Sequence, residues 1–335
     1  DHLRKITQRK NLTADEMADM IGEVFTGTVP DALIGAFMAA LATKGETFEE
    51  LAGAARAMRR KAARIQVSAP AVVDTCGTGG DGTGTFNIST TTAFVVAGCG
   101  VTVAKHGNRS VSSRCGSADL IEALGVNLNA PPDLVEEAVA EIGIGFLFAP
   151  LYHGAMKHAA AARKELGIRS IFNMIGPLTN PAGADCQLLG VYAPQLTEMF
   201  AEALRLLGSR RALVVHGLDG LDEISVCAPT RVTELKDGLI RTYDIDPERF
   251  LGRRAAPAEV AGGDPARNAE ITRGVLAGGK GACRDVVVLN AAAALMAAGK
   301  TDGIEAGMRL AAESIDSGAA RRKLDDLVKF TRQAG

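Results

Sequence analysis

The fold of this 335-residue chain is decided by the stretch Asp74-Thr-Cys-Gly-Thr-Gly-Gly-Asp-Gly-Thr-Gly-Thr-Phe-Asn-Ile-Ser-Thr90. A β-branched run before it predicts a strand over residues 71–76, and an apolar segment after it predicts a helix over residues 88–98. Five glycines lie within residues 77–84, so backbone N–H groups there can approach a ligand that side chains would otherwise block. Because a helix start also attracts anions, the stretch predicts a phosphate-binding strand–loop–helix.

Two better-known glycine loops compete with this interpretation. Gly77, Gly79 and Gly82 satisfy the dinucleotide fingerprint GxGxxG, which by itself is a weak signal. A dinucleotide site also needs an acidic residue about 20 residues later, at the end of the second strand. The second predicted strand, residues 101–103, ends instead in Ala-Lys-His, a cation where an anion is required. The sequence also has no GxxxxGK[ST] motif, so both a nicotinamide site and an ATPase P-loop are disfavoured.

The chain changes character near residue 70. Before that point the pattern predicts helices only, two of which begin at the capping boxes Thr13/Glu16 and Thr47/Glu50. After it, β-branched runs alternate with alanine- and leucine-rich stretches, which predicts an α/β fold with a central, mainly parallel sheet flanked by helices. The expected strand runs are 72–73, 101–103, 188–191, 213–215 and 286–289, with a hairpin formed by 223–227 and 231–235.

These patterns predict two domains. A small all-α domain comprises residues 1–68, joined by about 155–185, where the chain is helical and then rich in Gly, Pro and Asn. The larger α/β domain comprises residues 69–154 and 186–335. The glycine-rich loop falls inside this larger domain.

Composition excludes several classes of partner. Hydrophobic residues make up 47% and charged residues 23%, with a net charge of −2, so neither nucleic acid nor a membrane is an expected partner. The six cysteines include no CxxC pair, which predicts free thiols in a reducing compartment. The richest apolar stretch, residues 286–299, is shorter than the ~20 residues of a membrane span, and the polar N-terminus is unlike a signal peptide. We therefore expect a cytoplasmic protein.

A basic segment follows the second predicted strand. Residues 105–113, Lys-His-Gly-Asn-Arg-Ser-Val-Ser-Ser, supply two fixed cations, an imidazole and several hydroxyls. Because the carboxyl ends of neighbouring parallel strands share one crevice, Lys105 is expected to face the glycine loop and neutralise a pyrophosphate. The alternative is a surface loop whose basic residues are simply solvated.

In these motifs the chain resembles the anthranilate phosphoribosyltransferase family over nearly its whole length. The motifs are Gly77-Thr-Gly-Gly-Asp81, Asn87-Ile-Ser-Thr90, Lys105-His-Gly-Asn-Arg109, Gly176-Pro-Leu-Thr-Asn-Pro181 and Gly220-Leu-Asp-Glu-Ile224. The resemblance implies transfer of the phosphoribosyl group from 5-phosphoribosyl 1-pyrophosphate to anthranilate, a step of tryptophan biosynthesis. It also implies Mg²⁺ as cofactor and a homodimer formed through the helical domain.

The resemblance also implies individual site residues. The phosphoribosyl pyrophosphate contacts are Gly77, Gly80, Asp81, Thr85, Asn87, Ile88, Ser89, Thr90, Lys105, Gly107, Asn108, Arg109, Ser110, Val111, Ser112, Ser113 and Ser117. The anthranilate contacts are Gly77, Asn108 and Arg163, the Mg²⁺ ligands are Ser89, Asp222 and Glu223, and the catalytic residues are Lys105 and His106. Without the resemblance, the adjacent acids would be interpreted as a solvated turn and Arg163 as surface charge.

Chemistry is consistent with these implied roles. Mg²⁺ prefers a few carboxylates plus substrate phosphates, and a guanidinium binds a carboxylate such as that of anthranilate bidentately. An aromatic amine is already neutral at pH 7, so a strong base is not required, and His106 is the nearest candidate if one acts. Two alternatives remain: pyrimidine nucleoside phosphorylase-like ribosyl transfer, and a non-catalytic relative that binds nucleic acid.

Overall fold

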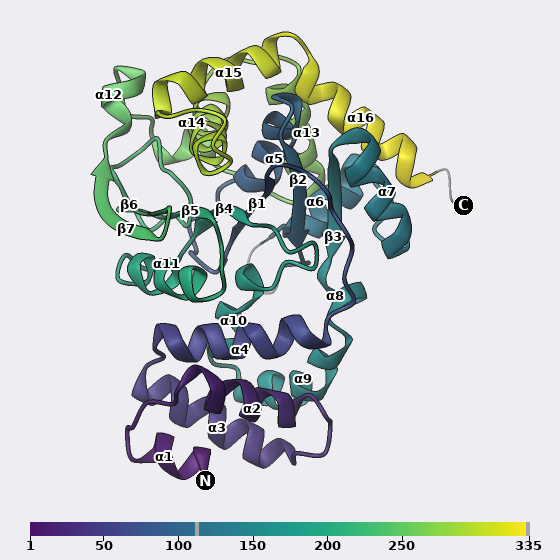
Figure 1. Ribbon diagram of the computed structural model, residues 1–335. Helices are drawn as coiled ribbons and strands as arrows, with labels where there is room; N and C mark the ends of the chain where they lie inside the picture. Colours follow the sequence, from purple (N-terminus) through teal and green to yellow (C-terminus); the bar gives the residue numbers. More distant parts are fainter. Residues whose placement is uncertain (111–113, 333–335) are drawn as a thin grey trace.

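A seven-stranded sheet forms the centre of the larger part of the molecule in the computed structural model, which describes residues 1–110 and 114–332 (Figure 1). The strand order is β3-β2-β1-β4-β5-β6-β7; the first five strands are parallel, and β6 and β7 are antiparallel to their neighbours. The strands are β1 (Val72–Gly77), β2 (Thr102–Gly107), β3 (Ile144–Phe148), β4 (Cys186–Gly190), β5 (Arg211–Gly217), β6 (Thr230–Lys236) and β7 (Leu239–Ile245). The expected fold class, a mainly parallel sheet flanked by helices, is confirmed.

Helices cover both faces of the sheet. On one face lie α5 (Ile88–Gly98) and α14 (Ala282–Ala297), both apolar over nearly their whole length and buried in one cluster with the sheet. On the other face, α11 (Leu196–Leu206) packs against β5 and β6, between the sheet and the N-terminal helices (Figure 1). Further helices around the sheet are α6 (Ser117–Leu124), α7 (Pro132–Ile142), α8 (Ala149–Tyr152), α12 (Pro247–Leu251), α13 (Pro265–Leu276), α15 (Ile304–Asp316) and α16 (Ala319–Arg332).

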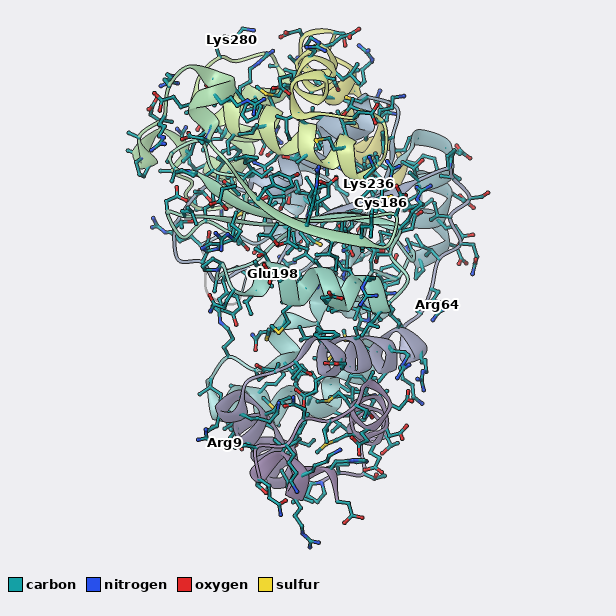
Figure 2. The ribbon with its side chains drawn as sticks, turned by 60° about the vertical axis from the view of Figure 1, so that its left-hand side comes forward. Arg9, Arg64, Cys186, Glu198, Lys236 and Lys280 are labelled. Atoms are coloured by element: carbon teal, nitrogen blue, oxygen red, sulfur yellow. The ribbon has the colours of Figure 1, made fainter. Side chains whose placement is uncertain are left out.

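The N-terminal residues form a separate group of helices. It consists of α1 (His2–Thr7), α2 (Ala14–Val24), α3 (Asp31–Lys44) and α4 (Phe48–Lys61), against which α9 (Lys157–Leu166) and α10 (Ile171–Met174) pack. Figure 2 shows the length of the molecule, with Arg9 among these helices and Lys280 at the opposite end. The proposed division at residues 68, 155 and 185 stays a prediction, because one apolar cluster includes these helices, α11 and one face of the sheet.

Both capping boxes form as predicted. The Thr13 side chain accepts a hydrogen bond from the Glu16 backbone, and Thr47 accepts one from Glu50. Glu50 is fully buried, and its carboxylate also accepts from the Leu12 backbone at 2.9 Å and from the ammonium of Lys44 at 2.9 Å. A buried carboxylate needs such partners, and here they join the starts of α2 and α4 to the end of α3.

Two local predictions are wrong. The run 286–289 is not a strand, because it lies inside α14, where every neighbouring turn is also apolar and buried. A short apolar run cannot distinguish a buried helix from a buried strand by periodicity. The hairpin is formed by β6 and β7, residues 230–245. Residues 223–227 belong instead to the irregular loop that connects β5 to β6. Among the described residues, no helix combines the length and the apolar character that a bilayer crossing requires.

Candidate active site

The glycine-rich loop leaves the carboxyl end of β1 and is anchored at both ends. At its start, the Thr78 backbone donates to the Gly190 carbonyl on β4 at 2.9 Å. At its end, Phe86 donates to the Val260 carbonyl at 3.1 Å, and Thr85 forms an isolated bridge with Ala261. Between these anchors four glycines have φ between +65° and +74°, a conformation that side chains disfavour: Gly79, Gly80, Gly82 and Gly84.

The acidic loop after β5 contacts both ends of this glycine-rich segment. The Gly79 backbone donates to the Asp222 carboxylate at 2.8 Å, and the Ser89 backbone at the start of α5 donates to the Glu223 carboxylate at 3.1 Å. A side chain at Gly77 would also clash, since a Cβ there would lie 2.7 Å from the same Asp222 oxygen. The three residues implied as Mg²⁺ ligands, Ser89, Asp222 and Glu223, are therefore adjacent although distant in sequence.

Three carboxylates crowd this position. Asp81 accepts from the Asp222 backbone at 3.4 Å and from the Thr83 hydroxyl at 2.6 Å. Burial, and secondly the Asp81 charge, raise the pKa of Asp222 to about 7. Burial and the Asp222 charge raise the pKa of Glu223 well above its ordinary value, an effect that Lys105 partly opposes. The site is therefore short of positive charge and suited to a bound cation.

A hard divalent cation fits this donor set. Carboxylate and hydroxyl oxygens are the protein ligands that Mg²⁺ prefers, and it commonly completes its coordination with waters and substrate phosphates. In the described part of the chain, no group of three or more His, Cys, Asp or Glu side chains is arranged to hold a metal by itself. Two carboxylates and a hydroxyl are fewer ligands than Mg²⁺ takes, so waters or phosphate oxygens would have to complete its coordination.

Lys105 lies at the carboxyl end of β2 and is 3% exposed. Its ammonium donates to the Thr75 carbonyl on β1. The neighbouring Asp74 is fully buried and accepts from the His106 backbone at 3.2 Å and from the Asn180 side chain at 2.8 Å. These contacts join β1, β2 and the 176–181 motif, so the alternative that Lys105 is a solvated surface cation is excluded.

His106 faces a second histidine. Its Nε2 lies 3.2 Å from Nε2 of His153, which follows α8, so one ring donates and the other accepts. Burial, followed by the charges of His153 and Lys105, lowers the pKa of His106 to about 3, and burial lowers that of His153 to about 4. Both rings are consequently neutral at physiological pH. No feature of the sequence distinguishes His153 from an ordinary buried histidine.

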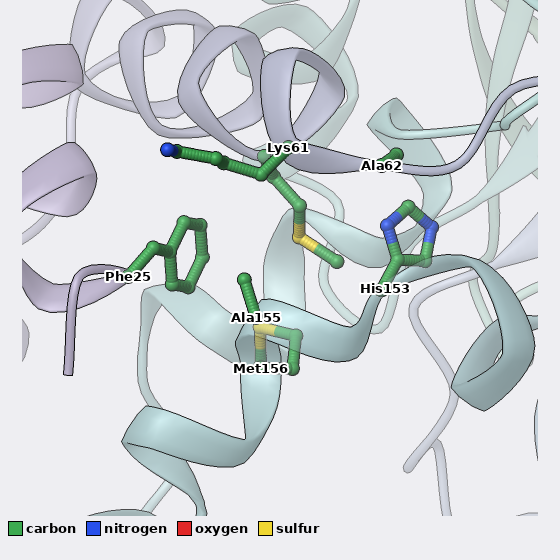
Figure 3. Close-up of a pocket in the computed structure, with 7 residues that line it drawn as sticks. Phe25, Lys61, Ala62, His153, Ala155 and Met156 are labelled. Atoms are coloured by element: carbon green, nitrogen blue, oxygen red, sulfur yellow. The ribbon is translucent and has the colours of Figure 1, made fainter.

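A small pocket lies beside His153, between the N-terminal helices and the segment after α8. Figure 3 shows Phe25 from the end of α2 and Lys61 from the end of α4 on one side of it, opposite Ala155 and Met156. Its remaining lining residues are Met58 and Ala62. His153, which lines this pocket, is also the residue that contacts His106 of β2.

The segment after β2 turns toward α6. The Asn108 backbone donates to the Ser117 hydroxyl at 3.1 Å, and Ser110 donates to Asp119 at 3.1 Å. Arg109 is 46% exposed, and its guanidinium pairs with Glu122 and Asp119, each at 2.9 Å. Glu122 and then Asp119 raise the pKa of Arg109. Its guanidinium thus pairs with two acids of α6, while Val111, Ser112 and Ser113 lie outside the described residues.

The other implied donor contacts surround the start of α5. The Asn87 side chain donates to the Cys115 carbonyl at 2.8 Å and accepts from the Thr90 hydroxyl at 3.2 Å. Ile88 and Thr90 are buried, so their side chains are part of the packing at the start of α5. At the end of β2, a Cβ on Gly107 would meet the Ser117 hydroxyl, which explains the glycine there.

Arg163 lies on α9, apart from the loops of the sheet. Its guanidinium carbon is 5.9 Å from the centre of the Phe172 ring, and burial lowers its pKa. The three residues implied as anthranilate contacts therefore come from three separate elements: Gly77 ends β1, Asn108 follows β2 and Arg163 lies on α9. Sequence reasoning also missed Asn180, although it lies within the 176–181 motif, and Arg169, which contacts the glycine loop.

Comparisons with known proteins agree along the whole chain. Residues 1–62 match the glycosyl transferase family, helical bundle domain, and residues 69–321 match the glycosyl transferase family, a/b domain. The anthranilate phosphoribosyltransferase of Syntrophobacter fumaroxidans is 71% identical, over 99% of this chain and 99% of its own.

Solved structures give the same result. A crystal structure of anthranilate phosphoribosyltransferase from Thermus thermophilus is similar with a TM-score of 0.94 at 45% identity, covering 99% of each chain. The Saccharomyces cerevisiae anthranilate phosphoribosyltransferase in complex with PRPP (phosphoribosyl pyrophosphate) and Mg is similar with a TM-score of 0.89 at 28% identity, covering 99% of this chain and 98% of the yeast one.

Proposed function

This chain belongs to the anthranilate phosphoribosyltransferase family, and from that premise we propose how its own residues perform the reaction. The enzyme transfers the phosphoribosyl group of 5-phosphoribosyl 1-pyrophosphate to anthranilate, giving N-(5-phosphoribosyl)anthranilate and pyrophosphate. This reaction is a step of tryptophan biosynthesis. The assignments of individual residues that follow are proposals supported by the geometry described above.

The donor binds along the glycine-rich loop. The observation that supports this most directly is that Asp222 and Glu223 accept hydrogen bonds from the N–H groups of Gly79 and Ser89. These contacts bring the acidic loop to the start of the glycine-rich loop and to the N-terminus of α5, where an anion is favoured. The other loop amides and Lys105 are then within the same crevice at the carboxyl end of the sheet.

The metal completes the donor site. The yeast relative contains Mg²⁺ together with phosphoribosyl pyrophosphate. In this chain Asp222 and Glu223 have too little positive charge around them, and they fit the same ion. We assign Ser89, Asp222 and Glu223 as its protein ligands. When bound, Mg²⁺ supplies positive charge next to the leaving pyrophosphate. Lys105 supplies a second, fixed positive charge from β2, and the loop N–H groups donate to the phosphate oxygens.

The acceptor lies between the sheet edge and α9. Arg163 pairs with the anthranilate carboxylate, while Asn108 and the backbone of Gly77 orient its amine. The amine nitrogen forms the new bond to the anomeric carbon as the bond to the pyrophosphate oxygen breaks, and the nitrogen then loses one of its two protons to water. Orientation supplies much of the rate, because both reactants are held in one geometry. His106, neutral and hydrogen-bonded to His153, contributes polarity next to the amine; its low pKa makes it a poor base near pH 7.

Three further proposals follow from family membership. The chain forms a homodimer through its helical domain, where Leu33 of α3 is 51% exposed. It works in the cytoplasm, and its domains divide near residues 68, 155 and 185. Sedimentation at several concentrations tests the first of these, since a monomer at micromolar concentration would contradict it.

The reaction is tested by the loss of anthranilate fluorescence when the chain, phosphoribosyl pyrophosphate and Mg²⁺ are mixed. We expect the loss to require all three components and to stop on addition of a chelator. Thymidine plus inorganic phosphate gives no reaction if the phosphorylase alternative is wrong. Retention on DNA that depends on salt, in the absence of transfer, would instead support a nucleic-acid-binding relative.

A further inference from the structure

Arg169 contacts the glycine-rich loop from the segment between α9 and α10. Its guanidinium donates to the Gly80 carbonyl at 2.9 Å, and the guanidinium carbon lies 3.8 Å from the centre of the Tyr192 ring. A Cβ on Gly80 would collide with the same guanidinium. The side chain thus fills the space that the glycine leaves open, on the helical side of the loop.

Tyr192 holds the same short stretch by a second contact. Its backbone N–H donates to the Thr78 hydroxyl at 3.2 Å. Arg169 and Tyr192 therefore anchor the residues on both sides of Gly79, whose own N–H is bound by Asp222. The ring stack is also unusually close for this protein, because the other cation–aromatic pairs of the described chain have separations of 5.1 to 5.9 Å.

We infer that Arg169 is a positioning residue for the donor loop, held in place by Tyr192. The inference rests on the proposed function of the loop as the phosphoribosyl pyrophosphate site. In a trans peptide the Gly80 carbonyl and the Asp81 N–H point in opposite directions. Anchoring the carbonyl therefore orients the Asp81 N–H away from Arg169 and limits the loop to a conformation in which its amides are presented together.

The position of Arg169 also connects the two halves of the site. It follows α9, which carries Arg163, the residue assigned to the acceptor. Through Arg169, the segment that carries Arg163 is hydrogen-bonded to the glycine-rich loop, which is proposed to hold the donor. Arginine is suited to this role because a planar guanidinium can stack on a ring and donate in its own plane at once, whereas a lysine ammonium cannot.

The test compares five variants with the wild-type enzyme: Arg169→Ala, Arg169→Lys, Tyr192→Phe, Tyr192→Ala and the double variant Arg169→Ala/Tyr192→Ala. Arg205→Ala is the matched control, since Arg205 is a surface arginine paired with Glu202 on α11. For each variant, KM for phosphoribosyl pyrophosphate, KM for anthranilate, kcat and the thermal unfolding temperature are measured.

We expect Arg169→Ala to raise KM for phosphoribosyl pyrophosphate about tenfold, the usual effect of losing one charged hydrogen bond. KM for anthranilate should change less, and the unfolding temperature should match that of Arg205→Ala. Arg169→Lys should resemble Arg169→Ala. Tyr192→Phe keeps the ring and should behave as wild type, while Tyr192→Ala should resemble Arg169→Ala, and the double variant should add little to either.

Three results would overturn the inference. One is an unchanged KM for phosphoribosyl pyrophosphate in Arg169→Ala; another is an equal rise in both KM values. The third is full rescue by lysine. Should Arg169→Ala fail to fold, the difference between Tyr192→Phe and Tyr192→Ala decides in its place. A wild-type chain without transferase activity would refute the proposed function itself, which is a separate outcome.

Discussion

The proposed donor and acceptor halves of the site are built in different ways. The donor half lies on the carboxyl edge of the sheet, where Asp222, Glu223 and Lys105 make direct contacts with the β1–α5 segment. The acceptor half is sparse. Arg163 comes from α9, and His106 of β2 contacts His153, which follows α8.

This difference has a physical cause. Pyrophosphate carries several charges, so its site needs fixed amides and cations in a constant arrangement, and a rigid sheet edge provides them. Anthranilate offers one carboxylate and a ring, so a single arginine and a few apolar contacts suffice. The donor half should therefore be the less tolerant of substitution.

The largest effect is expected when both acids of the donor half are neutralised. Asp222→Asn with Glu223→Gln keeps an oxygen to accept from the Gly79 and Ser89 N–H groups, but it removes the charge that attracts Mg²⁺. We expect kcat/KM to fall roughly a hundredfold to a thousandfold. The response to added Mg²⁺ should weaken as well, which a titration of activity against metal concentration measures.

Asp219→Asn is the matched control for this variant. Asp219 belongs to the same loop, but its carboxylate accepts from the Ser225 hydroxyl at 2.7 Å, a contact that an amide oxygen preserves. Near wild-type activity is expected for it. Ordinary Mg²⁺ dependence in the double variant would exclude the two acids as ligands and remove the contrast between the halves.

A smaller effect is expected at the acceptor half. Arg163→Lys keeps the charge but loses the bidentate geometry, so KM for anthranilate should rise about tenfold to a hundredfold, with KM for phosphoribosyl pyrophosphate nearly unchanged. Lys164→Ala, the exposed neighbour on α9, is the control and should have no effect. If Arg163→Lys raised both KM values by the same factor, Arg163 would not act on anthranilate binding alone.

Sequence position also explains which residues of the site can be predicted from the sequence alone. Residues 74–90 are contiguous, and their glycines, helix start and preceding strand predict a phosphate-binding loop without any long-range information. The cation after the second strand can be placed because parallel strands end at one edge. In contrast, Asp222 and Arg163 have the local pattern of surface charges, and only the family resemblance assigns them a role.

Other features depend on packing that no local pattern encodes. His153 is significant only because the fold places its ring 3.2 Å from His106, and Arg169 only because its guanidinium stacks on Tyr192. The strand predicted over 286–289 is wrong because burial on all sides removes the periodicity that separates helix from strand. The pairing of Arg109 with Asp119 and Glu122 of α6 also depends on the fold, and its expected role at the donor stays a prediction.

The smallest effect on rate is expected at His106. Its pKa of about 3 keeps the ring neutral above pH 5, so kcat should show no inflection near pH 6.5 that arises from this group. His106→Asn retains a polar side chain and should lower kcat by about tenfold or less, with an unaltered pH profile. A wild-type inflection between pH 6 and 7 that disappears in His106→Asn would restore the histidine as a general base.

Stability provides an independent check on the same ring. In the unfolded chain a histidine titrates near pH 6.5, whereas in the folded protein His106 and His153 titrate at about 3 and 4. Between these limits the two histidines bind more protons in the unfolded state, so their contribution makes the free energy of unfolding decrease as pH falls from about 6.5 toward 4, whereas the raised pKa values of Asp222 and Glu223 act in the opposite direction in both proteins. His106→Asn removes one of the two contributions, and its stability should therefore fall less steeply over that interval in chemical denaturation at a series of pH values. Equal slopes for the two proteins would mean that His106 binds a proton as readily in the native state as in the unfolded chain. The neutral His106–His153 pair would then not exist.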